Sequence, residues 1–145
     1  MRQRVHLACL PMEDAQENAA IVNAIQRRST VVVQKSLAEG FGLTVAEAMW
    51  KSRPVVASAV GGIKDQVVDG EVGVLLDDPL DLRTFGDAIR GLLADPIRAN
   101  RIGRNAREQV RRHFLVNRHA RQYIELLSAV IGESANSSAA RARTA

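Results

Sequence analysis

The amino-acid sequence predicts an α/β fold, a parallel sheet with flanking helices and a helical C-terminal part. Short runs of β-branched and other apolar residues, of the length of a buried strand, alternate with stretches whose apolar residues recur at helical spacing. Such alternation favours parallel strands joined by right-handed crossovers. Because ligands of these sheets bind beyond the carboxyl ends of the strands, we expect a functional site in the loops at that edge.

All the predicted strands lie in the N-terminal part of the chain. The predicted strands are residues 5–10, 31–34, 55–58 and 73–76. The intervening helices are predicted by apolar spacing, by acidic residues at the start of the first one, and by Pro54, which cannot continue a helix. These helices are residues 14–28, 43–52 and 63–68.

From Asp81 onward the chain is predicted to be helical. One apolar stripe ends at Asp95-Pro96, a second helix spans about 97–113, and a third spans about 117–131. The sequence after Gly132 lacks periodicity and bulky apolar side chains. We therefore expect one domain over residues 1–131 and a mostly disordered tail over 132–145.

The composition is that of an ordinary globular protein, with 46% hydrophobic and 25% charged residues among 145. The net charge of +4 suggests nucleic acid as a partner, but the basic residues are interspersed with helical apolar positions. Only 3% of residues are aromatic, so the platforms on which bases stack are missing, and nucleic acid is not the expected partner. The three histidines show no metal-ligand grouping, so no metal is expected.

No membrane span or signal peptide is predicted, because no apolar run approaches the ~20 residues needed to cross a bilayer. Cys9 is the only cysteine, which excludes an intrachain disulfide and favours a cytoplasmic location. Since Cys9 lies in an apolar run, we expect an inert thiol in the core.

The most informative stretch joins the predicted strand at 31–34 to the helix after it. Glu39 and Glu47 stand eight positions apart, and Gly40 and Gly42 follow the first of them. A strand, a glycine-containing loop and a helix together direct free backbone N–H groups and the positive end of a helix dipole at a phosphate. The glycines allow the backbone to approach a ligand closely, and the carboxylates are acceptors for sugar or ribose hydroxyls.

A second pair of glycines, Gly61-Gly62, follows the predicted strand at 55–58. In a parallel sheet this turn lies at the same edge as Glu39 and its glycines. We therefore expect the two glycine loops to lie close together.

Three segments together resemble a known family: E-G-F-G-L-T-V-A-E-A-M-W-K, P-V-V-A-S-A-V-G-G-I and V-D-G-E-V-G-V-L-L. They are similar to the C-terminal half of retaining GT-B glycosyltransferases of glycosyltransferase family 4, which have two facing Rossmann-like domains and an E-x7-E motif. The likeness is greatest to the trehalose-forming synthases, and it extends from about Val5 to Leu127. It implies that the chain is a truncated C-terminal domain, with a partial Rossmann-like sheet of about four strands.

The resemblance also implies roles for individual residues, none of which is catalytic and none of which binds a metal. The donor is a nucleotide-diphosphate sugar, and no cofactor is implied. Its sugar is bound by Glu39 and the loop Gly40, Phe41 and Gly42; its phosphate by the N–H groups of Leu43 and Thr44; and its ribose by Glu47. Gly61 and Gly62 line the pocket, and the base lies near Leu10, Pro11 and Met12.

The reaction implied is the metal-free transfer of glucose, with retention, from a nucleotide-diphosphate glucose to glucose. In the family the acceptor domain and two phosphate-clamping cations, an arginine and a lysine, lie upstream of the part that this chain resembles. We therefore expect the isolated chain not to catalyse transfer. The alternatives are a non-catalytic nucleotide-sugar-binding or assembly module and, less favoured, a basic nucleic-acid-associated domain.

The family's sheet order, three-two-one-four-five-six, has a structural consequence. Strands one and two normally separate the segments that correspond to residues 5–10 and 31–34. Without them, either the first strand moves beside the second or an apolar edge is left open. Open edges recruit partners, so we expect a homodimer, or a partner that supplies the missing half.

Overall fold

The computed structural model describes residues 5–9 and 13–142, with side chains up to residue 131. At its centre lies a three-stranded sheet in the order β1-β2-β3, with every pairing parallel. The strands are β1 (Val32–Gln34), β2 (Val55–Ser58) and β3 (Val74–Leu76). In the middle strand, Val56 pairs with Val33 on one side and with Val74 on the other. The predicted parallel α/β fold is confirmed.

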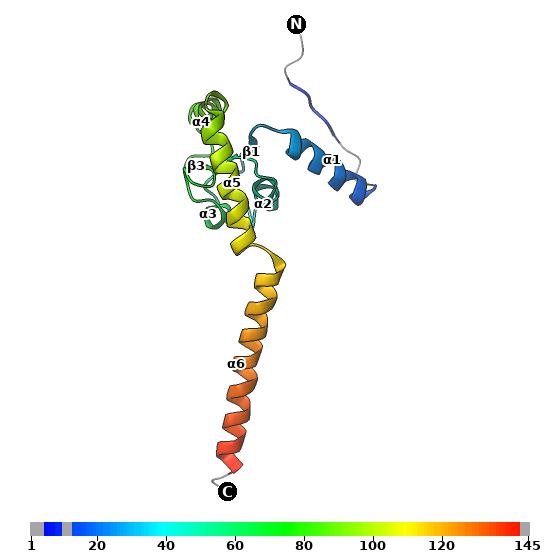
Figure 1. The fold of residues 1–145 in the computed structure, drawn as a ribbon, viewed down its shortest axis with the longest axis vertical. Coiled ribbons are helices and arrows are strands. Elements are labelled where there is room, and N and C mark those ends of the chain that lie inside the picture. Colours follow the sequence, from blue (N-terminus) through cyan, green and yellow to red (C-terminus); the bar gives the residue numbers. More distant parts are fainter. Residues whose placement is uncertain (1–4, 10–12, 143–145) are drawn as a thin grey trace.

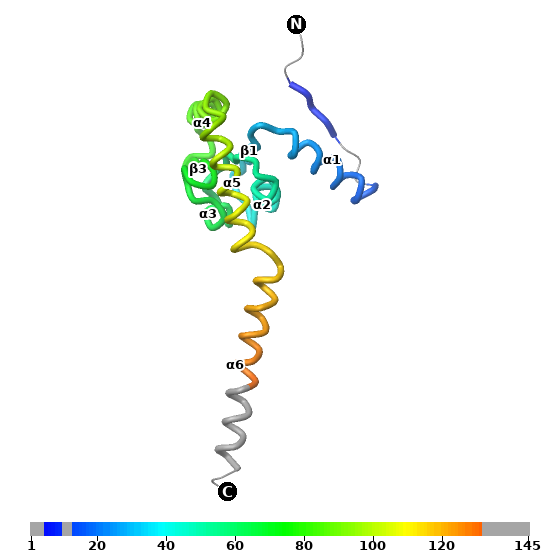
Figure 2. Tube along the Cα trace, in the orientation of Figure 1, coloured from blue at the N-terminus to red at the C-terminus, as the bar shows by residue number. Residues whose placement is uncertain are grey.

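Helices follow each strand, and Figure 1 shows them gathered around the sheet except at the two ends of the chain. The helices are α1 (Ala15–Arg28), α2 (Leu43–Trp50), α3 (Ile63–Gln66), α4 (Leu82–Ala94), α5 (Pro96–His113) and α6 (Val116–Ala142). Helix α1 stands off to one side of the body, and α6 extends away from it (Figures 1 and 2). The body is therefore formed by β1 to α5.

The core has two parts, one on each face of β2. Val55 and Ala57 belong to the part that also contains α2, while Val56 belongs to the part that contains α4. Helix α5 contributes to both, because Ile102 near its start packs with the α4 side and Val110 near its end with the α2 side. Strand β2 is buried at every position, as expected for a central parallel strand.

Side-chain caps mark the starts of three helices. The Asp14 carboxylate accepts from the backbone N–H groups of Gln16 and Glu17 at 2.8 and 3.0 Å and begins α1. Asp81 and Asp95 cap α4 and α5 in the same way. Such caps satisfy N–H groups that have no partner within the helix.

The prediction of a strand at residues 5–10 is wrong for the part that the structure describes. Residues 5–9 form no strand, and Val5 and Leu7 are 71% and 95% exposed; Leu10 lies outside the described residues. A strand needs a neighbour that pairs with its backbone and covers its side chains, and this segment has none among the residues that the structure describes. For the same reason Cys9 is exposed, not in the core as we expected.

The sheet consequently has three strands, not about four, and β1 is paired on one side only. Of the two arrangements expected for the edge, the structure shows the open one. Val33 on this edge strand is 42% exposed.

At the other end of the chain, α6 continues to Ala142, beyond the expected helix end at about 131. Residues 143–145 lie outside the described part, and the order of the tail over 132–145 in solution stays a prediction. Across residues 5–9 and 13–142, none of the helices has the length and hydropathy needed to cross a membrane.

Candidate functional site

The loop between β1 and α2 ends at Gly42, which begins the helix. Its φ is 82°, and a Cβ added there would lie 2.7 Å from Cγ1 of Ile63, so a side chain does not fit. Because glycine has no side chain, α2 begins without a side-chain cap. The N–H groups of Leu43 and Thr44 have no acceptor among the described residues. They form an uncapped positive helix end, as a phosphate site requires.

The second glycine turn packs directly against this loop. The Gly62 N–H donates to the Gly40 carbonyl at 2.7 Å. A Cβ added to Gly61 would lie 1.7 Å from the carbonyl oxygen of Glu39, and one added to Gly62 would lie 2.6 Å from that of Gly40. The closeness of the two loops is confirmed, and their backbones leave no room for a side chain.

Gly40 itself differs from these glycines. A Cβ at this position would meet nothing within 4 Å, although its carbonyl is held by Gly62. The space that a side chain at Gly40 would occupy is therefore open, as expected where a ligand approaches the backbone.

The Glu39 carboxylate is held by two neutral donors at the carboxyl end of β1. Its Oε2 accepts from Nε2 of Gln34 at 3.3 Å and from Oγ of Ser36 at 3.2 Å. Oε1 has no hydrogen-bond partner within the described part of the chain. The carboxylate is fixed in place with one oxygen available.

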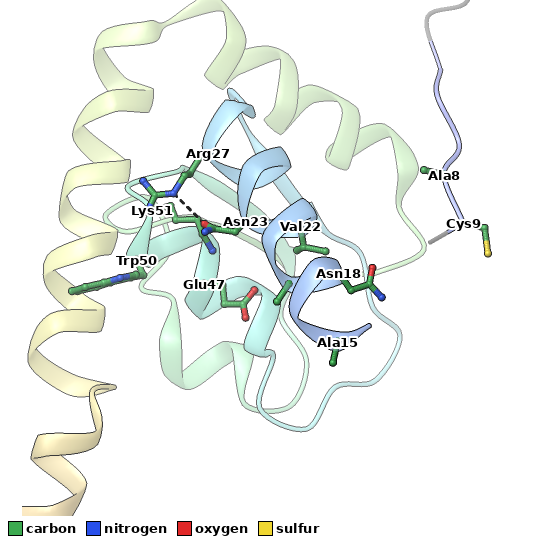
Figure 3. Close-up of a pocket in the computed structure, with 11 residues that line it drawn as sticks. Ala8, Cys9, Ala15, Asn18, Val22, Asn23, Arg27, Glu47, Trp50 and Lys51 are labelled. Carbon is green, nitrogen blue, oxygen red and sulfur yellow. Dashed lines mark hydrogen bonds between the residues drawn. The ribbon is translucent and has the colours of Figure 1, made fainter. Parts of the chain in front are cut away.

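Glu47 lies one helical turn inside α2 and faces α1, not the glycine loops (Figure 3). Its Oε2 accepts from Nε2 of Gln26 at 3.4 Å, and its Oε1 has no partner in residues 5–9 and 13–131. Glu47 also lines an open cavity of about 890 Å³ between α1, α2 and the segment 5–9. Like Glu39, it combines one oxygen held by a neutral amide with one available oxygen.

Phe41 links the loop to the rest of the body. Its carbonyl accepts from Nε2 of the fully buried Gln66, and its half-exposed ring meets the Phe114 ring edge-on at 6.0 Å. The conformation of the loop is thus fixed from α3 and from the end of α5.

The structure brings most of the predicted site residues together, but not all of them. Residues 39–42, the start of α2 and the Gly61-Gly62 turn form one continuous surface. Glu47 belongs to the face of α2 that meets α1. Leu10, Pro11 and Met12, the predicted base site, lie outside the described residues.

The sequence analysis missed the polar side chains that hold the site: Gln26, Gln34 and Ser36 donate to the carboxylates, and Gln66 donates to the Phe41 carbonyl. Two of them carried a signal. Gln26 interrupts the apolar stripe of α1 four positions after Val22, and Gln34 ends the run of valines that forms β1. A polar residue at an apolar position of the pattern needs a partner, and that partner is often functional.

No group of three or more metal-ligating side chains occurs in the described ranges. Lys51 donates to Oε1 of Gln26 at 2.5 Å. Trp50 is 39% exposed beside the Arg107 guanidinium, whereas Met49 is buried in the core.

Comparison with known proteins gives the same family by sequence and by structure. Residues 14–109 match the family described as glycosyl transferases group 1. The trehalose synthase of Pyrococcus horikoshii is 44% identical over 115 residues, which are 79% of this chain and 27% of that protein. The chain therefore spans about a quarter of the length of the trehalose synthases that it matches.

Solved glycosyltransferase structures of the GT-B type match the fold. Sucrose-phosphate synthase from Thermosynechococcus elongatus is 36% identical with a TM-score of 0.69, over 81% of this chain and 28% of that one. Anabaena Alr3699/HepE, in complex with UDP-glucose, is 28% identical with a TM-score of 0.68, over 74% of this chain and 30% of that one.

Proposed function

The chain belongs to the glycosyl transferases group 1 family, and from this premise we propose that it binds the nucleotide-diphosphate sugar that donates the glycosyl group. One observation carries the proposal. Along the chain, the uncapped start of α2 lies between two glutamates, each with one oxygen held by a neutral donor and the other available. A nucleotide sugar carries a diphosphate between two groups rich in hydroxyls. The N–H groups at the start of α2 suit the diphosphate, and the carboxylate on each side of them suits the hydroxyls.

In this proposal each group of the site has one task. Glu39 accepts hydrogen bonds from hydroxyls of the sugar, and the open side of Gly40 admits the sugar to the backbone. The N–H groups of Leu43 and Thr44 bind the distal phosphate. Glu47 accepts from the ribose hydroxyls, and the base lies toward Leu10–Met12.

The reaction follows from the same groups. As the glycosidic bond breaks, charge develops on the departing diphosphate, and preorganised N–H groups stabilise that charge without reorganisation. We propose that, where an acceptor-binding domain completes the site, the transfer retains the anomeric configuration, moves glucose from nucleotide-diphosphate glucose to glucose, and uses neither a metal nor another cofactor. A cytoplasmic location belongs to this proposal, since a single cysteine suits a reducing compartment.

The test is a heteronuclear NMR titration of the 145-residue chain with UDP-, ADP- and GDP-glucose. We expect shifts that cluster at Glu39–Glu47 and Gly61–Gly62, and the ligand with the largest affinity identifies the base. Glu47→Ala should abolish these shifts. Glu125→Ala should leave them unchanged, because Glu125 lies on α6, which extends away from the body (Figure 1). An absence of shifts at millimolar ligand contradicts donor binding by this chain.

Activity is measured separately from binding. We expect the purified chain to form no disaccharide from donor and glucose, because a donor half-site alone does not position an acceptor. Disaccharide formation at an enzyme-like rate contradicts this expectation.

Assembly through the free edge of β1 is the second candidate function, as a homodimer or with a partner that supplies the missing half. Val33 on that edge is exposed, as are the apolar side chains of Val5 and Leu7 in the N-terminal segment, and exposed apolar surface favours association. Sedimentation from micromolar to millimolar concentration tests self-association. A monomer throughout that range removes the homodimer.

A further inference from the structure

Gln26 is the one side chain of α1 that the structure buries, with 5% of its surface exposed. The apolar neighbours Val22 and Ile25 are 38% and 56% exposed. Burial of an amide is costly unless its polar atoms are paired. The hydrophobic effect therefore does not explain why Gln26, and not an apolar neighbour, is buried against α2.

Both ends of the Gln26 amide are paired, with one partner in α2 and the other at the C-cap of that helix. Nε2 donates to Oε2 of Glu47 at 3.4 Å, and Oε1 accepts from Nζ of Lys51 at 2.5 Å. The bond to the lysine is therefore much the shorter of the two. An amide that supplies a donor to an anion and an acceptor to a cation bridges the two charges.

Glu47 in α2 and Lys51, the residue that caps the C-terminal end of this helix, are four positions apart, close to the spacing at which side chains of a helix face each other. A glutamate N-terminal to a lysine at this spacing is the favourable order for a direct ion pair. Nevertheless, the ion pairs of the described residues include none between them. The amide of Gln26 occupies the place where that pair would form.

We propose that Gln26 is a positioning residue: by holding Lys51, it prevents a Glu47–Lys51 ion pair and keeps the Glu47 carboxylate available as a hydroxyl acceptor. The inference rests on the proposed function for its ligand, the ribose of the nucleotide. An ammonium paired with Glu47 would compete with the weaker, neutral hydroxyl donors. The single long bond from Gln26 leaves Oε1 of Glu47 beside the cavity shown in Figure 3.

The test compares three variants of the chain. Gln26→Met has a similar length but neither donor nor acceptor, so Lys51 is released toward Glu47. We expect affinity for the tightest-binding of UDP-, ADP- and GDP-glucose to fall about tenfold, since a charged partner replaces a neutral one. Lys51→Met measures any contribution of the lysine itself. Gln26→Met combined with Lys51→Met should return the affinity to within threefold of the Lys51→Met variant.

A merely structural role of Gln26 predicts the opposite of this recovery, because deleting a second side chain would not restore packing. An unrecovered double variant therefore overturns the proposal. If Gln26→Met does not fold, Gln26→Ala makes the same comparison, because it also removes both the donor to Glu47 and the acceptor for Lys51.

Crystal structures of the ligand-free proteins separate this inference from the proposed function. In Gln26→Met, we expect Lys51 Nζ to lie within about 4 Å of the Glu47 carboxylate, the distance of an ion pair. If Lys51 remains away from Glu47, the positioning role is wrong, whatever the wild-type chain binds. If the pair forms but the wild-type chain binds none of the three nucleotide sugars, the positioning role of Gln26 is supported and the proposed donor is wrong.

Discussion

The body of the molecule, β1 to α5, and its two flanking helices have similar sequence patterns but different packing. Ile102 of α5 and Met49 of α2 are completely buried, whereas Ile124 and Leu127 of α6 are 65% and 57% exposed. Helix α1 buries only Gln26. Apolar spacing therefore shows that a helix has an apolar face, but it does not show whether this chain covers that face.

The candidate site crosses the boundary between these regions. Glu39 and the two glycine loops belong to the body, and their contacts are backbone to backbone. Glu47 is oriented by Gln26 from a helix whose other side chains are exposed or half-buried. Glu39 and the glycine loops are thus fixed by close packing, and Glu47 by one polar bridge.

The largest difference is expected between two isoleucines. Ile102→Ala in α5 should lower the free energy of unfolding by about 4 kcal/mol, because it removes buried methyl groups and leaves a cavity. Ile124→Ala in α6 should change it by less than about 0.5 kcal/mol, since that side chain is exposed. Denaturant unfolding measures both. Equal losses would mean that α6 packs against the body in solution, contrary to the comparison.

A second prediction separates close packing from backbone strain at two glycines with positive φ. Gly61→Ala should destabilise the fold by about 3 kcal/mol, because its Cβ meets the carbonyl oxygen of Glu39 and its φ is +49°. Gly70→Ala, with φ of +74° and open space around it, should cost only about 1 kcal/mol. Thermal unfolding of both variants provides the measurement. If the two losses are alike, the contact between the loops is not tight.

Most of the body could be predicted because each of its elements has a local signal and a partner in the chain. Strand β2 was predicted at Val55–Ser58 without error, and Asp95-Pro96 correctly separated two helices. The segment 5–9 has the same kind of apolar run, but its pairing depends on neighbours that are not among the described residues. Local pattern thus predicts which segments can be strands, and the available partners decide which ones are.

The site was predicted in part for a similar reason. Glu39, Gly42 and Gly61 have positions fixed by the order of strands and loops, so sequence reasoning could bring them together. The donors Gln26 and Ser36 could not be assigned in advance, because a side-chain contact depends on rotamers and on the angle between helices. The roles of all these residues toward a ligand stay predictions.

A third prediction compares equivalent caps in the two regions. Asp95→Ala removes the acceptor for the Arg98 N–H, 2.9 Å away, and should lower global stability by about 1 kcal/mol, because α5 spans both parts of the core. Asp14→Ala removes the same kind of cap from α1. It should increase hydrogen exchange within α1 without changing global unfolding, since α1 buries one side chain. A change in global unfolding for Asp14→Ala would show that α1 belongs to the cooperative unit.

The smallest effect is expected on the exposed face of α5, where charge and not packing is involved. Hydrogen bonds from Arg111 and then Arg112 lower the pKa of Glu108 from its ordinary value of 4.5 to about 2. A carboxyl whose pKa is lower in the folded state stabilises the fold above pH 4.5, and that stabilisation is lost as the pH falls toward 2. The melting temperature of the Glu108→Gln variant should therefore fall less between pH 5 and pH 2 than that of the unchanged chain.

Because these side chains are solvent-exposed, the difference should be small and should shrink in high salt. The control is Glu125→Gln in α6, whose side chain forms no ion pair with any described residue. Its melting temperature should follow the unchanged chain at every pH. If Glu108→Gln behaves like this control, the arginine pair adds nothing to stability, and the body is held by its apolar core and close backbone contacts alone.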